Sequence, residues 1–531
     1  MKTDDKHKSI FSKLIVVLFT LLMLGSVFMV SARNYDLFDT YRKYWTIISG
    51  LLFVIFISIG IAIEKERFKL PVDSMLKVIV VIGILESLYA LAQFFRILPS
   101  YNRFFAYTGS FENPAIFAML LSFCVPIAVY YAINEHTSKQ KKVTWGFIAV
   151  GMLVFIGFSE SRTGLIAATI TTGMIYLAQD ESLRKKLFEK RTMMIFIPIV
   201  IAAMVALYYF KADSANGRLL IWRVSIDMIK DRPLFGFGYN GFTAHYMEYQ
   251  AGFLESHPEN PFMLLADNVN NPFNEYLLIL VNFGVVGLVA LLYVLFMLVR
   301  TIWRSNNEYR VLILSLLLTI LEWACFSYPF SIQSIWVVAA LIVMTAILPL
   351  LCKYRVVLMS FASICIAGFV VAANCYKIEY RWKVISERSL MGETEAVLPD
   401  YSKLYEQLNH NGKFLYNYAA ELHYSGHHAE SLQIFDECSQ FLNDYDVQML
   451  MADCYQNISD TLSAISHYKT ANSMVPSKFL PLYNIMNLYL AAQDSVNAIN
   501  IAKDILSREV KENRSKMVQR IIKEAGEIVA Q

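Results

Sequence analysis

The stretch Gly217-Arg-Leu-Leu-Ile-Trp-Arg223 opens a segment of mixed composition, residues 211–273, that interrupts a series of apolar spans. The segment closes at Asn271-Pro-Phe-Asn-Glu-Tyr276, which runs directly into the next apolar span. The chain of 531 residues is 56% hydrophobic and 17% charged, with a mean hydropathy of +0.43. This composition excludes an ordinary soluble protein and predicts an all-α, polytopic membrane protein with one large polar segment between two spans.

About 20 apolar residues are needed to cross the roughly 30 Å hydrocarbon layer. The sequence contains about eleven apolar runs near this length, and we predict that each of them spans the membrane. The spans are expected near residues 10–31, 45–63, 74–98, 115–133, 143–158, 163–178, 193–210, 275–299, 309–327, 332–352 and 355–374. Together they predict a membrane helix bundle over residues 1–375, with residues 211–273 as its large loop.

The basic residues of the short loops orient the chain, since loops rich in Lys and Arg stay on the cytoplasmic side. Lysines mark the N-terminus, and each even-numbered gap between spans carries further basic residues. They are Lys2, Lys6, Lys8 and Lys13, then Lys65, Arg67 and Lys69, Lys139, Lys141 and Lys142, Arg184, Lys185, Lys186, Lys190 and Arg191, Arg300, Arg304 and Arg310, and Lys353 and Arg355. The first outer gap, with Arg33, Arg42 and Lys43, goes against the rule. Eleven spans then place the N-terminus in the cytoplasm and both residues 211–273 and the chain after 375 on the outer face.

A second domain is predicted for residues 376–531, where the apolar runs end and a period near 34 residues appears. Small and aromatic residues recur at matching positions of three units: Ser431, Phe435 and Cys438; Ala464, Tyr468, Ala471 and Pro476; and Ala498, Ala502 and Ile505. This pattern is typical of the tetratricopeptide repeat, in which small residues let antiparallel helices pack closely and stack on the next unit. We expect a concave surface that binds a protein partner or positions an acceptor; a passive helical cap is the alternative.

The C-terminal domain contains histidines and cysteines whose spacing does not predict a metal site. The histidines are His410, His423, His427, His428 and His467. Cys438 and Cys454 either pack as thiols or form a disulfide in an oxidising compartment. We find no nucleotide, haem or zinc motif in the sequence, so no cofactor and no metal are expected, and no nucleic-acid partner either.

Ser159-Glu-Ser-Arg-Thr-Gly164 lies between two predicted spans, on the outer side of the membrane. A charged residue at such a depth is costly and commonly faces a cavity or a partner. The planar guanidinium of Arg162 presents a fork of N–H donors, which suits it to hold a diphosphate. The alternative is that Arg162 extends to the membrane interface and pairs with Glu160.

Arg218 and Arg223 lie in a stretch with the pattern of an amphipathic helix, in which Ile221 and Val224 are apolar anchors. Such a helix can lie in the membrane interface and hold its arginines at the height of the lipid head groups. The next stretch, Asp231-Arg-Pro-Leu-Phe-Gly-Phe-Gly-Tyr-Asn-Gly241, is a glycine-rich turn. Glycine there permits close approach of the backbone but does not by itself predict phosphate binding.

Several motifs occur in an order that resembles the O-antigen ligase and polymerase family. They are Asn113-Pro114, Ser159-x-Ser-Arg-x-Gly164, Gly217-Arg-x3-Trp222, Asp231-x-Pro-Leu-x-Gly-x-Gly238 and Asn274-Glu-Tyr-Leu-x4-Asn-Phe-Gly-x2-Gly287. The ordered set is far more specific than any one motif, and the resemblance covers about residues 1–375. A fused C-terminal repeat domain suggests the Bacteroidetes-type branch of the family.

The resemblance implies a multi-span, C-type glycosyltransferase-like fold with a large periplasmic loop. It also implies transfer of a glycan from undecaprenyl diphosphate to an acceptor hydroxyl, without a metal or a nucleotide. Carried over by motif, Arg162 and Arg218 would bind the diphosphate, with Arg223 as a further candidate, while Asn274 and Trp222 would shape the site. Fixed cations there would stabilise the negative charge that grows on the leaving diphosphate.

The sequence departs from the family at one position that bears on the chemistry. The family commonly has a His before Asn274, favoured as the base that activates the acceptor, and this chain has Phe273 there. In its place His257 is the first candidate base and Glu275 the second, since a base must reach the acceptor hydroxyl within about 3 Å. His245, Asp267 and Glu255 are further alternatives.

We therefore expect an O-antigen ligase-like enzyme of the bacterial inner membrane, with lipid A–core as the acceptor and the C-terminal domain in the periplasm. A repeat polymerase that acts on another lipid-linked glycan and a protein O-oligosaccharyltransferase are the alternatives within this class. A lipid-linked-glycan flippase or a membrane scaffold is the non-enzyme alternative. A flippase is expected to carry charged residues through many spans, whereas the candidate arginines here gather at the outer side, which favours chemistry there.

Overall fold

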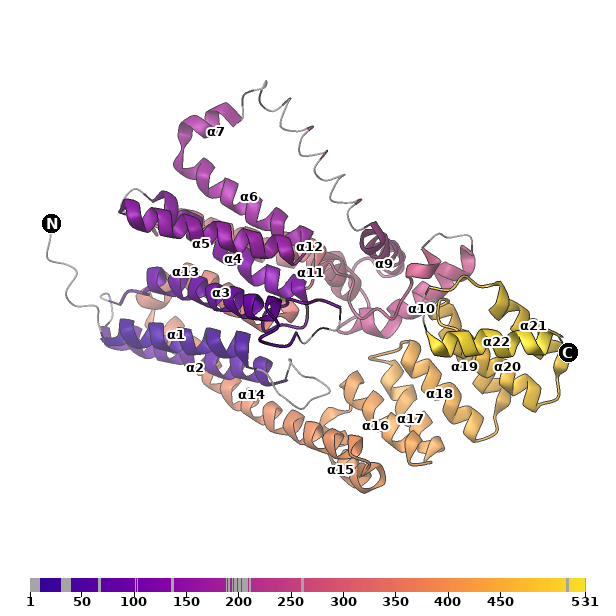
Figure 1. The fold of residues 1–531 in the computed structure, drawn as a ribbon. Helices are drawn as coiled ribbons and strands as arrows, with labels where there is room; N and C mark the ends of the chain where they lie inside the picture. The colour runs from indigo at the N-terminus through magenta and orange to yellow at the C-terminus, as the bar shows by residue number, and fades with distance from the viewer. Residues whose placement is uncertain are drawn as a thin grey trace. The chain divides into compact units, whose positions relative to one another are not determined.

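The computed structural model describes residues 10–29, 40–64, 68–100, 102, 104–134, 138–187, 189, 212–258, 262–511 and 515–530, with single positions at 192, 194, 198, 202 and 209. Every regular element within these residues is helical (Figure 1). The helices divide into two compact units, of which the first comprises residues 1–207 and 292–380 and the second comprises residues 208–291 and 381–531. The chain therefore enters the second unit twice.

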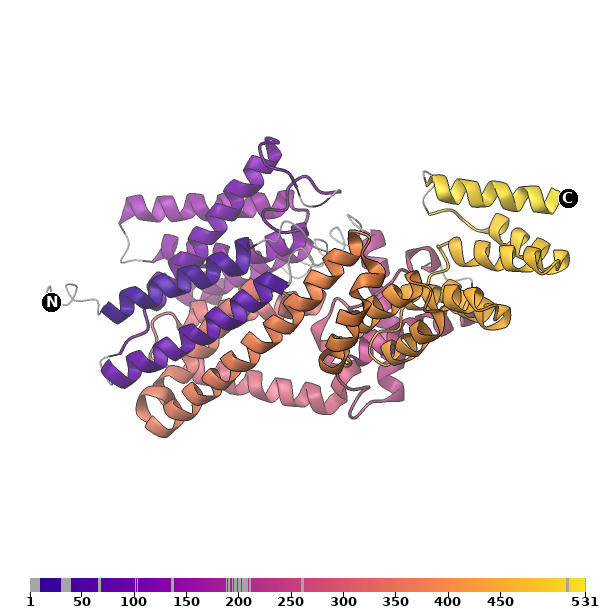
Figure 2. The same cartoon turned by 90° about the horizontal axis from the view of Figure 1, so that it is seen from below.

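The first unit is built from apolar helices. They are α1 (Ile10–Phe28), α2 (Thr40–Glu64), α3 (Val72–Phe94), α4 (Pro114–Ile133), α5 (Lys139–Phe158), α6 (Arg162–Gln179), the short α7 (Glu181–Leu187), the second part of α11 (Glu275–Arg304), α12 (Arg310–Phe326), the turn η3 (Pro329–Ser331), α13 (Gln333–Lys353) and most of α14 (Arg355–Leu390). Figure 2 shows the same helices from a second direction.

Eight helices in the described part of the chain are long and apolar enough to cross a membrane: α1, α2, α3, α4, α5, α11, α13 and α14. They coincide with eight of the predicted spans. The predicted spans at 163–178 and 309–327 are the helices α6 and α12, which are not among the eight, and α12 has 17 residues. The predicted span at 193–210 lies almost wholly outside the described residues. A multi-pass membrane protein is thus confirmed, while the count of eleven stays a prediction.

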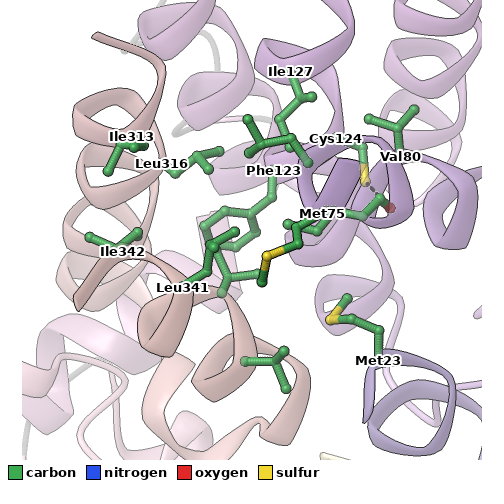
Figure 3. Close-up of a cluster of buried hydrophobic side chains, with 14 of the residues drawn as sticks. Met23, Met75, Val80, Phe123, Cys124, Ile127, Ile313, Leu316, Leu341 and Ile342 are labelled. Carbon is green, nitrogen blue, oxygen red and sulfur yellow. Dashed lines mark hydrogen bonds between the residues drawn. The ribbon is translucent and has the colours of Figure 1, made fainter. Parts of the chain in front are cut away.

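Helix α4 is the central helix of the first unit, packed against α3, α5, α6 and α12. It begins at Pro114, and the side chain of Asn113 caps it by accepting a hydrogen bond from the Ala115 N–H at 2.9 Å. Phe123 and Cys124 of α4 lie among apolar side chains from the neighbouring helices (Figure 3). Trp323 of α12 donates its indole N–H to Ser122 at 2.9 Å. An apolar core and one buried polar contact therefore hold α12 against α4.

The second unit combines the segment before α11 with the C-terminal helices. Its elements are α9 (Ala212–Asp231), α10 (Gly241–Ser256), η2 (Met263–Leu265), the first part of α11, the end of α14, α15 (Thr394–Leu408), α16 (Gly412–Tyr424), α17 (His428–Ser439), α18 (Tyr445–Asn457), α19 (Thr461–Met474), α20 (Leu480–Ala491), α21 (Ser495–Ser507) and α22 (Lys516–Ala530). We call the part from α9 to the start of α11 the outer segment.

The C-terminal helices form successive hairpins, in which α16 packs on α17, α18 on α19, and α20 on α21. Side chains of Asn411, Asp444, Asp460 and Asp494 cap four of these helices at their N-termini. The second helices of the three hairpins begin 33 and 34 residues apart, in agreement with the period of the sequence. The aligned residues within these helices are all buried: Ser431, Phe435, Cys438, Ala464, Tyr468, Ala471, Ala498, Ala502 and Ile505. Assignment to the tetratricopeptide family stays a prediction. Cys438 and Cys454 are free buried thiols.

The outer segment and the C-terminal hairpins share one apolar core. Phe242 and Tyr246 of α10 belong to the same buried cluster as Tyr468 of α19. Polar contacts reinforce the junction: the buried amide of Gln250 donates to the Met474 carbonyl at 2.7 Å, and Thr243 donates to the Phe441 carbonyl at 2.8 Å. The packing thus groups the outer segment with the chain after 380, whereas the sequence grouped it with the membrane domain. That residues 1–375 and 376–531 form separate domains therefore stays a prediction.

Candidate functional site

In the first unit, the Ser159–Gly164 motif forms the turn between α5 and α6. Ser161 caps α6 by accepting a hydrogen bond from the Gly164 N–H at 3.2 Å, and Arg162 is the first residue of the helix. A Cβ on Gly164 would lie 3.0 Å from Ile156 and 3.1 Å from Ala118, so glycine permits close packing against α5 and α4. The serine and the glycine thus have structural roles, and Arg162 is half-buried at the first position of α6.

In the second unit, α9 presents Arg218 to the turn that precedes α11. The guanidinium carbon of Arg218 lies 5.4 Å from the centroid of the Phe273 ring, a cation–π contact. One turn further along α9, Trp222 donates its indole N–H to the Pro272 carbonyl at 2.9 Å. Two contacts therefore hold α9 and residues 272–273 together, and they fix the side of α9 on which Arg218 lies.

The turn itself is strained at Phe273, whose φ is +53°. This left-handed region is a genuine outlier for a bulky residue, and such strain is common at functional sites. Side chains on either side hold it: Asn271 accepts from the Phe273 N–H at 2.8 Å, and Asn274 accepts from the Leu277 N–H at 3.0 Å to cap α11. The residue directly before Asn274 thus places an aromatic ring against an arginine.

The remaining candidates on these elements differ in exposure. Glu275 is buried, with 7% of its surface exposed, in the first turn of α11, where a negative charge is favoured by the helix dipole. Arg223 is exposed on α9. Trp222 and Asn274 have the hydrogen bonds described above. The structure therefore brings Arg218 and Trp222 against residues 272–273, directly before Asn274 and Glu275 in the chain, while Arg162 belongs to the first unit.

A cavity of about 360 Å³ lies beside this arrangement within the outer segment. Its lining combines α9, α10 and the chain before α11: Gly217, Leu220, Ile221, Gln250, Leu265, Asp267, Asn268, Val269, Asn270, Asn271 and Phe273. The amide of Asn268 donates to Asp444 and Asp446, each at 3.1 Å. Its Oδ1 is buried without a hydrogen-bond partner among the described residues. The cavity thus offers amides, a carboxylate and apolar surface, a mixture that suits a polar ligand with hydroxyl groups.

The glycine-rich turn docks by its backbone onto a break in α11. Gly284 has φ +63° and ψ −164°, which interrupts the helix. The Phe237 and Gly238 N–H groups donate to the carbonyls of Val281 and Asn282, and the Val285 and Val286 N–H groups donate to those of Pro233 and Leu234, at 2.8–3.2 Å. A Cβ on Gly236 would lie 2.5 Å from the Val281 carbonyl oxygen. Gly236 therefore permits close backbone contact, whereas Gly238 meets no neighbour and is favoured by its φ of +91°.

The histidine candidates lie on α10 and at its end. His257 caps the C-terminus of α10 and is exposed; its Nδ1 lies 2.9 Å from the Ser256 hydroxyl and 3.0 Å from the Phe253 carbonyl, and its ring stacks on Phe253. His245 is half-buried against Phe237. Burial lowers the pKa of His245, so its ring is held neutral near pH 7.

Some of these contacts carried no signal in the sequence. The stacking of Arg218 on Phe273 joins positions 55 residues apart, and the cavity gathers residues from three separate stretches. The paired Asn271 and Asn274 around a proline did mark a constrained turn, because Asn commonly bonds the backbone of a tight turn.

Substituting Gly284 tests the backbone docking. Gly284→Ala would place a Cβ 2.3 Å from the Leu234 carbonyl in a conformation that only glycine adopts readily. We expect the docked state to lose about 3 kcal/mol or more, so that limited proteolysis cleaves residues 231–241 roughly 100-fold faster. Gly252→Ala on α10, where an added Cβ meets nothing within 4 Å, is the control and should leave cleavage unchanged or slower. Equal cleavage of the two variants would contradict the role given to Gly284.

Comparison with known proteins agrees with the arrangement of these motifs. The chain matches an uncharacterized protein of Haemophilus influenzae at 24% identity over 252 residues, which is 43% of this chain and 60% of that relative. The match thus spans about three fifths of the relative's length. Residues 115–292, from α4 to the middle of α11, match the family model described as O-antigen ligase. This region contains Arg162 and the whole outer segment, and over it the chain is similar to the O-antigen ligase family.

Proposed function

We propose that the protein transfers a glycan from undecaprenyl diphosphate to an acceptor hydroxyl on the periplasmic face of the bacterial inner membrane, as an O-antigen ligase does with lipid A–core as acceptor. The observation that carries the proposal is Arg218, held by Phe273 and by the Trp222–Pro272 contact beside a polar cavity. The family match over residues 115–292 supports the same class of reaction.

The proposed reaction breaks the bond between the anomeric carbon and the diphosphate oxygen and forms a bond from that carbon to the acceptor oxygen. Negative charge grows on the leaving diphosphate, and Arg162, Arg218 and Arg223 are the proposed groups that neutralise it. The stacking on Phe273 restricts the side chain of Arg218 before substrate binds, so less conformational entropy is lost on binding. In this proposal the arginines supply the positive charge, and the transfer itself uses no metal or nucleotide.

The acceptor is proposed to bind in the cavity beside Arg218. Asn268, Asn270 and Asn271 line the cavity, and side-chain amides can both donate hydrogen bonds to sugar hydroxyls and accept them. The amide of Gln250 is already engaged with the Asp267 and Met474 carbonyls, at 3.1 and 2.7 Å, so it holds the wall in place. We therefore propose that these asparagine amides contact the hydroxyl groups of the acceptor.

A protein acceptor is the second proposal, and one observation favours it. The C-terminal hairpins share an apolar core with the outer segment, so a protein bound on the hairpins would be linked rigidly to the proposed site. The proposed orientation, with a cytoplasmic N-terminus, puts both parts in the periplasm. A repeat polymerase stays an alternative within the class, and a flippase or scaffold outside it.

Charge substitution tests the proposed diphosphate site. With the purified protein and a lipid-linked glycan donor, Arg218→Gln and Arg162→Gln are each expected to lower the transfer rate by about 10²–10³-fold, the usual effect of removing one transition-state contact. Lys230→Ala, which removes an exposed cation from the same helix α9, is the matched control and should keep the native rate. A double variant of both arginines that still transfers at the native rate would exclude this function.

The acceptor is identified in cells that lack the gene. Lipopolysaccharide on a silver-stained gel loses its ladder if the chain is a ligase, and the ladder collapses to one repeat if it is a polymerase. An intact ladder with glycoproteins of lower mass on a blot of the same cells identifies a protein acceptor. If neither changes, the transfer proposal fails.

The base is tested by paired variants of the two candidates. His257 engages its Nδ1, which leaves Nε2 as the nitrogen that would take the acceptor proton. His257→Ala is expected to lower kcat by about 10²–10⁴-fold and to flatten the acidic limb of the pH–rate profile. Glu275→Gln is measured in parallel. If a variant keeps the acidic limb of the pH–rate profile, the residue that it replaces is excluded as the base. His245→Ala serves as the third comparison; if it alone flattens the limb, neither His257 nor Glu275 is the base.

A further inference from the structure

Three side chains with metal-binding atoms meet within the C-terminal hairpins. They are His423 near the end of α16, His428 at the start of α17 and Cys454 on α18. One potential ligand atom from each lies within 4.8 Å of the others. The Nδ1 of His423 lies 3.1 Å from the Cys454 Sγ, and the two histidine rings are 5.2 Å apart.

The fold explains why these three residues meet, although their spacing in the sequence matches no metal-binding motif. Helices α16 and α17 are joined by a tight turn in which Gly426 has φ +81°, and this turn brings His428 back beside His423. Helix α18 belongs to the next hairpin and packs against both α16 and α17, so it carries the buried Cys454 into the same place. The cluster therefore joins two successive hairpins.

The cluster contains a polar atom that the protein leaves unsatisfied. The Nδ1 of His428 is buried and has no hydrogen-bond partner among the described residues. Such an atom loses its bonds to water without replacement, which destabilises the folded form. A bound ion would accept its lone pair. The exposed neighbour His427 lies outside the cluster.

We propose that His423, His428 and Cys454 bind one Zn²⁺ ion. Two imidazoles and a thiolate are ligands that this borderline-soft ion prefers, and hard ions such as Mg²⁺ or Ca²⁺ take oxygen ligands instead. Zinc bonds of about 2.0–2.3 Å require the three donors, which lie within 4.8 Å of one another, to move closer together when the ion binds. The Cys454 thiol releases its proton to solvent when it binds, and a water molecule completes the tetrahedron.

The ion would fasten α18 to the α16–α17 hairpin. Because the ligands come from two hairpins, the ion stabilises their packing by binding the folded form and not the unfolded chain. The inference stands on these contacts alone and does not depend on the proposed glycan transfer.

The full chain in detergent, stripped with a chelator, is titrated with Zn²⁺ and with Co²⁺ as a spectroscopic probe. We expect one equivalent to bind, with a thiolate-to-cobalt charge-transfer band. Cys454→Ser should abolish the band, and His428→Ala should weaken binding by more than ~100-fold, beyond the effect typical of outer-shell partners. His427→Ala removes an adjacent histidine and should bind as the native chain does.

Two results would overturn the proposal: no uptake of either ion by the native chain, or equal uptake by all three variants. A simple hydrogen bond between His423 and Cys454 predicts the first result. Folding of the variants is checked by comparing the helical circular dichroism of the metal-free proteins. The native chain gives an independent measure, since adding Zn²⁺ to the stripped protein should slow hydrogen exchange in α16 and α18.

Discussion

Gly284 interrupts helix α11, so backbone N–H and carbonyl groups next to it lack partners within the helix. The turn after Arg232 supplies their hydrogen-bond partners. Four backbone hydrogen bonds join the two stretches, and neither could approach the other with a larger residue at Gly236 or Gly284. This docking fixes the end of α9 and the beginning of α10 relative to the first turns of α11. The position of Arg218 over Phe273 depends on it, because both residues lie on the elements that the docking joins.

An arginine meant for a diphosphate must be held without losing its donors. In the proposed function Arg218 is oriented by the face of the Phe273 ring, since a cation–π contact engages the plane of a guanidinium and its N–H groups point outward along the edge of that plane. The strained backbone at Phe273 is the cost of this arrangement, and the flanking asparagines offset it with hydrogen bonds.

The parts of the fold that the sequence predicted are those that depend on local pattern. Apolar runs of sufficient length gave eight span-capable helices, and the aligned small and aromatic residues of three units are buried as the repeat pattern requires. The sequence could not predict contacts between distant stretches. The shared core of Phe242 and Tyr468, the stacking of Arg218 on Phe273 and the meeting of His423 with Cys454 each depend on tertiary packing. Motif glycines identified a close backbone approach but not its partner.

The shared core of α10 and α19 has a consequence for the order of folding during synthesis. The ribosome produces the outer segment well before the hairpins that cover it, at about 5–20 residues per second. Until residues 445–474 emerge, Phe242, Tyr246 and Met247 have no cover on that side and the amide of Gln250 has no carbonyl of Met474 to bind. Helices α13 and α14, which are long and apolar enough to cross a membrane, are synthesised in that interval. The outer segment therefore completes its folding last, when the C-terminal hairpins reach it.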